Sequence, residues 1–247
     1  TIEFGNTTNY LAWLKSQNLS TIPTWKDELY LEYHQGTYTT QAKMKEENRV
    51  GEVLLTNAEK FSSLATLLGG IYNGNDLEEA WRSVLFNQFH DILPGSGIRE
   101  TYIDANEKYE EARAIGNFEL SKPLNYIARQ VNTASIRKGT PLVVFNPLSW
   151  ERSDVVNVEL PKGDFADFAV LDAQGKEVAS QIITKDRYRR EILFLAEKIP
   201  SLGYTTYQLR KQKPTARQTG MAISYTSLEN EFFKIAIDPE SGWLKSI

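Results

Sequence analysis

The chain changes character near Gly139, and this change constrains its fold more than any other feature. Before Gly139, apolar residues recur at helical spacing. After it, short apolar runs alternate with Gly, Pro and Asp turn signals. Helices followed by strands, rather than alternating with them, indicate an α+β chain with more than one domain.

The first half carries the pattern of a helical bundle. Apolar residues recur at helical spacing from residue 41 to about residue 68, and Gly69-Gly70 is a typical helix stop. Asp76, with Glu79 three residues later, predicts the N-cap of a second helix that runs to about Asp91. Further helical stretches are expected at 9–17, 98–114 and 119–131, the last of which contains Pro123 and is expected to kink there. We predict a three-helix bundle.

The second half reads as a series of short strands. They are predicted at 141–146, 155–160, 168–171, 178–183, 192–195, 204–209, 223–225 and 232–237. This spacing, with turn signals between the runs, indicates an antiparallel β-sandwich. The predicted organisation is a tail or linker over 1–25, a helical middle domain over 26–134 and a β-sandwich region over 135–247, which we expect to be incomplete.

Composition excludes several function classes. The 247 residues hold 28 Lys and Arg against 32 Asp and Glu, and no basic stripe is visible, so nucleic acid is not an expected partner. No apolar run approaches the length of a membrane span, so we expect no membrane association. The chain has no cysteine, which rules out disulfides and thiolate metal sites and favours the cytoplasm. The oligomeric state stays open, a homo-oligomer included.

The segment NQFHDILPGSGI at 87–98 holds one of only two histidines. Helical spacing puts four polar residues on one side of the second helix: Ser83, Asn87, His90 and Asp91. His and Asp are both reasonable zinc ligands, but adjacent residues diverge, so only one of the pair is expected to bind a given ion. A simpler interpretation also fits the spacing: the helix macrodipole favours a histidine at the C-terminus, and Asp91 is solvated.

Three segments carry a resemblance to a known family. The segment HDILPGS at 90–96 resembles the second zinc-ligand segment of glycoside hydrolase family 38, the class II α-mannosidases. Upstream, ELYLEYHQGTYTT at 28–40 is similar to the segment that opens the family's helical middle domain. Downstream, VFNPLSW at 144–150 looks like the first strand of the family's β-domain, continued by LGYTTY at 202–207 and LENEFF at 228–233. The resemblance therefore covers nearly the whole chain.

The resemblance implies a zinc-dependent retaining α-mannosidase acting on mannose-containing oligosaccharides or small mannosides. His90 would be one zinc ligand, and Asp91 would sit by the bound sugar and hydrogen-bond its hydroxyls. His34 falls where some relatives place an aromatic residue under the sugar ring, so it is a further substrate-binding candidate, with a surface loop histidine as the alternative. Tyr38 is another candidate, with simple packing as its alternative.

The rest of the family's catalytic equipment has no match in this sequence. The family places a His-x-Asp zinc motif and the nucleophilic aspartate in an N-terminal α/β domain, which we infer to be absent from this chain. The zinc in that family has two His and two Asp ligands, and a second carboxylic acid protonates the leaving oxygen. We therefore expect no catalytic residue in this chain, one zinc ligand, and no activity from the chain alone.

Two other functions stay open. The chain could be a non-catalytic carbohydrate-binding or scaffold module of the same architecture, because no second carboxylate-rich motif is present. It could also be a hydrolase that uses internal carboxylates, since Asp27, Glu28 and Glu32 cluster near His34 and Asp91 could approach them. The linkage and identity of a mannoside substrate are not encoded in any motif that we find.

Overall fold

A computed structural model describes residues 2–29, 34–134, 136, 138–215 and 220–247. Residues 30–33, which belong to the predicted opening segment at 28–40 and include Glu32, lie outside the described residues. The chain divides into two compact units. One comprises Thr1–Val53 and Glu79–Ala114, and the other comprises Leu54–Glu78 and Ile115–Ile247.

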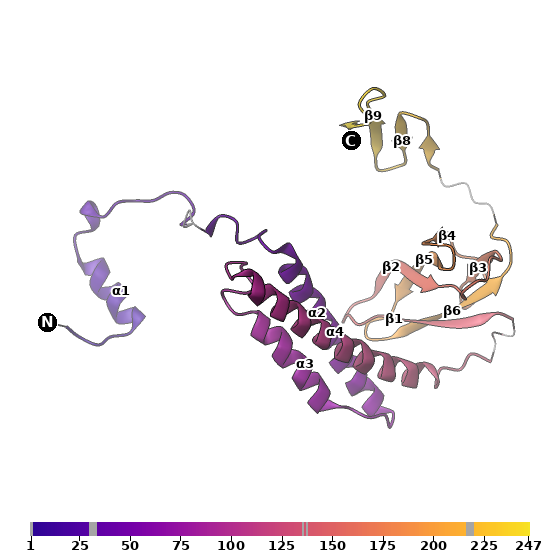
Figure 1. Cartoon of the computed structure of the whole chain (residues 1–247), viewed down its shortest axis with the longest axis horizontal. Helices are drawn as coiled ribbons and strands as arrows, with labels where there is room; N and C mark the ends of the chain where they lie inside the picture. Colours follow the sequence, from indigo (N-terminus) through magenta and orange to yellow (C-terminus); the bar gives the residue numbers. More distant parts are fainter. Residues whose placement is uncertain (1, 30–33, 135, 137, 216–219) are drawn as a thin grey trace. The chain divides into compact units, whose positions relative to one another are not determined.

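The first half of the described chain is helical, as predicted. Its helices are α1 (Thr7–Ser16), the 3-10 helix η1 (Leu19–Thr21), α2 (Ala42–Leu67), α3 (Gly74–Asn87) and α4 (Arg99–Ala128). Helices α2, α3 and α4 run side by side, and each contributes residues to both units (Figure 1). The three-helix bundle of an α+β chain is thereby confirmed.

The glycine pair after α2 ends that helix as the sequence predicts. Gly69 adopts a φ of 92°, in the left-handed region that glycine tolerates. The Gly70 N–H then donates to the Ala65 carbonyl at 2.8 Å. This bond from beyond the helix back to its last turn satisfies a carbonyl that would otherwise have no helical partner.

Helix α3 begins at Gly74, earlier than predicted, because Asn73 rather than Asp76 precedes its first turn. The Leu77 N–H donates to the Asn73 carbonyl at 3.4 Å, which makes Asn73 the N-cap. The Asn73 amide donates to the Asp76 carboxylate in the first turn and, at 3.4 Å, to Glu119. Asp76 thus stabilises the cap from inside the helix instead of forming it.

The prediction of two helices at 98–114 and 119–131 is wrong, because α4 is a single helix that includes Gly116 and Pro123. A Cβ at position 116 would lie 2.8 Å from the Leu54 side chain and 2.9 Å from that of Leu55. Gly116 therefore allows α2 and α4 to approach closely and does not end the helix. A glycine that serves packing and one that stops a helix look the same in a sequence.

Small buried residues also hold the bundle together in the first unit. A Cβ at Gly51 of α2 would lie 2.8 Å from Val84 of α3, so these helices are in close contact there. The buried helical residues of this unit include five that are at most 2% exposed: Met44, Ala80, Val84, Ala105 and Tyr109.

In the second unit, an aromatic contact joins α2 and α4 to the first β-strand. Phe61, Ala65 and Ile127 are buried together, and Phe145 packs against them. The Phe61 and Phe145 rings lie edge to face, with centroids 5.5 Å apart. The Lys60 ammonium also donates to the Pro147 carbonyl at 3.2 Å.

The strands after residue 139 form an antiparallel sandwich of two three-stranded sheets, in the orders β1-β6-β3 and β2-β5-β4. Their bounds are β1 (Thr140–Phe145), β2 (Arg152–Glu159), β3 (Phe168–Leu171), β4 (Ser180–Thr184), β5 (Arg190–Ile199) and β6 (Tyr204–Lys211). The core between the sheets is apolar and includes Val170, Ile192 and Phe194, each at most 2% exposed. The predicted sandwich is confirmed.

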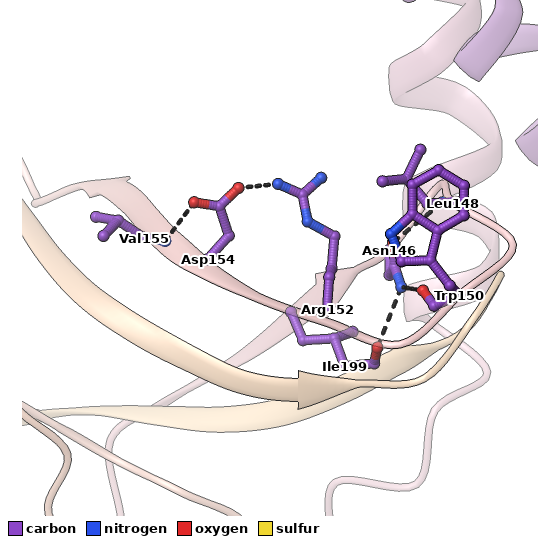
Figure 2. A network of polar contacts seen from close by, with 7 residues as sticks. All are labelled: Asn146, Leu148, Trp150, Arg152, Asp154, Val155 and Ile199. Carbon is purple, nitrogen blue, oxygen red and sulfur yellow. Dashed lines mark hydrogen bonds and ion pairs between the residues drawn. The ribbon is translucent and has the colours of Figure 1, made fainter.

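A buried asparagine closes one end of the sandwich (Figure 2). Asn146 follows β1 and is fully buried. Its amide donates to the carbonyls of Trp150 at 2.7 Å, Ile199 at 3.1 Å and Pro200 at 3.1 Å, and its side-chain oxygen accepts from the Leu148 N–H at 3.0 Å. One side chain thus ties the β1–β2 connection to the end of β5.

A third sheet of short strands follows, in the order β10-β9-β8-β7. Its strands are β7 (Ala222–Ile223), β8 (Ser227–Glu229), β9 (Lys234–Ile237) and β10 (Leu244–Ser246). Many of its apolar side chains are exposed, including Tyr225, Phe232 and Trp243. None of the helices that the structure describes is long and apolar enough to cross a membrane.

Candidate functional site

The His-Asp motif lies on a loop between α3 and α4, which we call the 88–98 loop. The chain leaves α-helical geometry at Asn87 and continues through successive tight turns. The N–H groups of Phe89 and Ile92 donate three residues back, to Phe86 and Phe89, at 3.1 and 2.9 Å. Gly95 closes the series with a φ of 93°. The loop is therefore built from local turns that project His90 and Asp91 away from the end of α3.

The predicted polar stripe along α3 is wrong for its two helical members, Ser83 and Asn87. Ser83 and Asn87 face the bundle interior, at 8% and 0% exposure, and the Asn87 amide donates to the Ala105 carbonyl at 2.8 Å. Leu85, which lies between them in the sequence, is 55% exposed. His90 and Asp91 lie beyond the helix, so helical spacing does not relate them to residues 83 and 87.

His90 and Asp91 point their polar atoms toward each other in solvent. The His90 Nε2 lies 3.4 Å from the Asp91 Oδ2, with side chains 77% and 58% exposed. An exposed pair at this distance contributes little to stability. The Phe89 ring stacks obliquely on the imidazole, with centroids 4.1 Å apart. Both functional groups are thus available to an external ligand.

Two hydroxyls hold the loop around this pair. The Tyr102 hydroxyl, in the first turn of α4, accepts a hydrogen bond from the Gly97 N–H at 2.7 Å and donates to the Asp91 carbonyl at 3.4 Å. The Ser96 hydroxyl donates to the Asp91 Oδ1 at 3.4 Å. Tyr102 is only 7% exposed, whereas Ser96 and Asp91 are exposed. The buried contact is the stronger constraint because it is shorter and shielded from water.

A polar cluster anchors the start of the 88–98 loop. The Gln88 amide donates to Asn48 at 2.9 Å and to Glu52 at 3.1 Å, both on α2. Burial, together with the smaller effect of the charges of Glu47 and Glu52, raises the pKa of the nearby Tyr109 to about 12. Tyr109 is therefore a neutral phenol at every physiological pH.

The segment that carries His34 approaches the same loop. A Cβ at Gly95 would lie 2.9 Å from the Thr40 carbonyl oxygen, so Gly95 permits close contact with the chain just before α2. His34 and Tyr38 lie in the turns that lead to Thr40, and both are exposed, Tyr38 at 81%. The two candidate segments are thus joined through Gly95 and Thr40, and the roles of His34 and Tyr38 stay predictions.

The donor types of this loop fit zinc, but their number does not suffice. A catalytic zinc site uses three protein ligands and a structural site uses four. Within the described ranges, no group of three or more His, Cys, Asp or Glu residues could hold a metal ion. His90 and Asp91 could therefore form only part of a zinc site, with the other ligands supplied from elsewhere.

The internal-carboxylate hypothesis gains no support. Asp27 and Glu28 are exposed, and the Asp27 carboxylate accepts from the Glu28 N–H at 2.8 Å, a local turn contact. Glu32, the third acid of that hypothesis, lies outside the described residues.

Sequence reasoning missed Tyr102 and Ser96. The available signal was an aromatic residue in the first turn of the helix that follows a Pro-Gly loop, but such a residue is usually part of a core. Whether its hydroxyl faces the core or the preceding loop depends on the loop conformation, which no periodicity predicts.

Comparison with known proteins gives matches across both halves of the chain. Residues 32–124 match the sequence model of a family described as the α-mannosidase middle domain. Alpha-mannosidase 2C1 of Mus musculus is 38% identical over 146 residues, which is 57% of this chain and 13% of that protein. An alpha-mannosidase of Saccharomyces cerevisiae is 33% identical over 141 residues, 56% of this chain and 12% of that protein. The chain therefore spans only a small part of the curated relatives that it matches.

Solved structures extend the likeness to nearly the whole chain. An alpha-mannosidase from Enterococcus faecalis superposes with a TM-score of 0.67 at 21% identity, over 94% of this chain and 31% of that one. A glycosyl hydrolase family 38 protein from the same organism gives 0.68 at 21% identity, over 95% and 32%. At this identity the superpositions establish the fold. The sequence matches show that residues 32–124 are similar to the α-mannosidase middle domain.

Proposed function

We propose that the full-length protein is a zinc-dependent retaining α-mannosidase and that this chain supplies part of its active site. The observation that supports the proposal most directly is the position of the His90-Asp91 pair within the matched middle domain, exposed on a loop held from α4. The substrates would be mannose-containing oligosaccharides or small mannosides.

His90 and Asp91 would have different roles. The exposed Nε2 of His90 is a typical zinc donor, so His90 would provide one ligand. Asp91 would accept hydrogen bonds from sugar hydroxyls, since its side chain is 58% exposed, with Ser96 at one carboxylate oxygen and the His90 imidazole at the other. His34 would lie against the sugar. When bound, zinc would act as a Lewis acid that orients the sugar's hydroxyls.

The proposal assigns no nucleophile or acid to this chain. A retaining glycosidase needs two carboxyl groups about 5–5.5 Å apart on either side of the scissile bond. Those groups would come from outside these 247 residues. The chain on its own would therefore lack turnover.

The test is hydrolysis of an aryl α-mannoside by the full-length protein, before and after zinc removal with a chelator and zinc readdition. We expect activity that follows the zinc and a first product that keeps the α configuration by NMR. H90A should lose zinc and activity, while N157A, an exposed change in the sandwich, should lose neither. Zinc-dependent turnover by the 247-residue chain alone, or full activity in H90A, would contradict the proposal.

A non-catalytic carbohydrate-binding module is the second candidate. It is favoured because, in the part of the chain that the structure describes, no group of three or more His, Cys, Asp or Glu residues could hold a metal ion. Binding of mannosides by the full-length protein without hydrolysis, at zinc saturation, would select this alternative.

A further inference from the structure

Residues 91 and 97 of the 88–98 loop both contact the hydroxyl of Tyr102. The Tyr102 oxygen accepts from the Gly97 N–H at 2.7 Å and donates to the Asp91 carbonyl at 3.4 Å, and the residue is only 7% exposed. We propose that Tyr102 is a positioning residue, which sets the direction of His90 and Asp91 toward the zinc and the sugar. This inference rests on the proposed function.

The hydroxyl, rather than the ring, carries the argument. A tyrosine hydroxyl can donate one hydrogen bond and accept others, and Tyr102 does both at once. Other backbone bonds of the loop span three or four residues, such as those from Ile92 and Leu93 to Phe89. The Tyr102 contact instead joins residues 91 and 97, so it constrains the path of the loop between them.

The position of the Asp91 carbonyl connects Tyr102 to the metal ligand. This carbonyl belongs to the residue directly after His90, so holding it restricts the backbone on which the imidazole is mounted. Gly95 adds a second constraint from the other side, where it contacts the Thr40 carbonyl. Removing the hydroxyl should leave the fold intact while the imidazole samples more orientations.

The chain offers a matched control on the same helix. Tyr109 is also buried, at 2% exposure, and its hydroxyl has no hydrogen-bond partner within the described structure. Y109F removes the same atom from α4, where it makes no hydrogen bond to the 88–98 loop. Y102F removes the hydroxyl that holds Gly97 and Asp91.

The experiment compares Y102F, Y109F and H90A in the full-length zinc protein. Zinc affinity is measured by competition with a chelator, and amide exchange at Gly97 is measured by mass spectrometry. Loss of a group that orients a metal ligand costs about 10–100-fold in affinity, so Y102F should weaken zinc binding about tenfold. Y109F should leave affinity unchanged, and Gly97 exchange should accelerate only in Y102F.

The outcomes separate this inference from the proposed function. If H90A loses zinc but Y102F matches Y109F in affinity, Tyr102 has no positioning role and the proposed function stands. If H90A binds zinc as well as the unaltered protein, both fall. If Y102F does not fold, Gly97 exchange in the unaltered zinc protein decides: a protected amide is expected, and exchange as fast as in a free peptide overturns the inference.

Discussion

Replacing Asn146 with alanine should open one end of the β-sandwich. Its NH2 group has two hydrogens shared among three carbonyls, and its oxygen accepts from the Leu148 N–H. The change therefore removes about three hydrogen bonds, each worth about 1 kcal/mol net, for a loss of about 3 kcal/mol in unfolding free energy. Buried carbonyls left without a donor, such as that of Ile199, make this a lower bound.

Amide hydrogen exchange in the 247-residue chain measures this effect locally, without requiring a two-state transition of the whole molecule. A loss of about 3 kcal/mol raises the opening equilibrium about a hundredfold, and Leu148 and the central residues of β5 should report it. The control is N157A, since Asn157 is exposed and its 2.6 Å bond to Glu191 is worth at most about 1 kcal/mol.

Asn146→Asp refines the test. It keeps the acceptor for Leu148 but places a second oxygen against the three carbonyls. Burial and these dipoles should raise the pKa of the new carboxyl, so the variant should be less stable than N146A at pH 7 and recover as pH falls. Exchange in N146A indistinguishable from that in N157A would refute the reasoning.

Two further changes test the packing and the charges of the second unit. G116A should destabilise the bundle by about 1–2 kcal/mol in thermal unfolding, since the clash with Leu54 and Leu55 outweighs the helix propensity of alanine; a stabilised variant would show that α2 and α4 can separate at low cost. The pKa of Asp164 is held below its usual range, first by the Ala166 N–H and then by Lys211, and that of Asp238 by the Ser241 N–H. The stability that these two ionised carboxylates give to the fold is fully present above their unfolded-state pKa and is lost as pH falls through the lower folded-state pKa. The melting temperature should therefore decrease once the pH is below about 4. D164N should flatten that slope, and an unchanged slope would assign it to other carboxylates.

The sequence predicts elements whose side-chain period extends over several turns or strand residues. Helix α2, strand β3 and the Gly69-Gly70 stop follow from such patterns. Strands β8 and β10 were not predicted, because three residues are too few to show an alternation. The helix break expected near residue 116 was wrong. Gly116 is there because the side chains of Leu54 and Leu55 on α2 leave no room for a Cβ.

In the candidate site, too, local sequence patterns predicted some features, and others depended on the three-dimensional structure. His90 and Asp91 were singled out because their motif resembles a family segment; their polar atoms lie 3.4 Å apart, and their roles stay predictions. Their relation to Asn87 was wrong, because the helical spacing used for it ends at that residue. The contacts of Tyr102 could be found only once the loop conformation was known. Its partners are a backbone N–H and a backbone carbonyl, which every residue except proline carries, so the sequence does not mark them.

The Asn146 network gives the two ends of the sandwich different tolerance to changes in chain length. At the Asn146 end, a single side chain sets the distance between the β1–β2 connection and the turn after β5 (Figure 2). An extra residue there would separate a donor from its acceptors. At the opposite end, the β4–β5 hairpin is closed by exposed local contacts between Asp186 and Arg189. Insertions, tags or an inserted domain therefore belong at that hairpin, where added length disturbs only solvent-facing bonds.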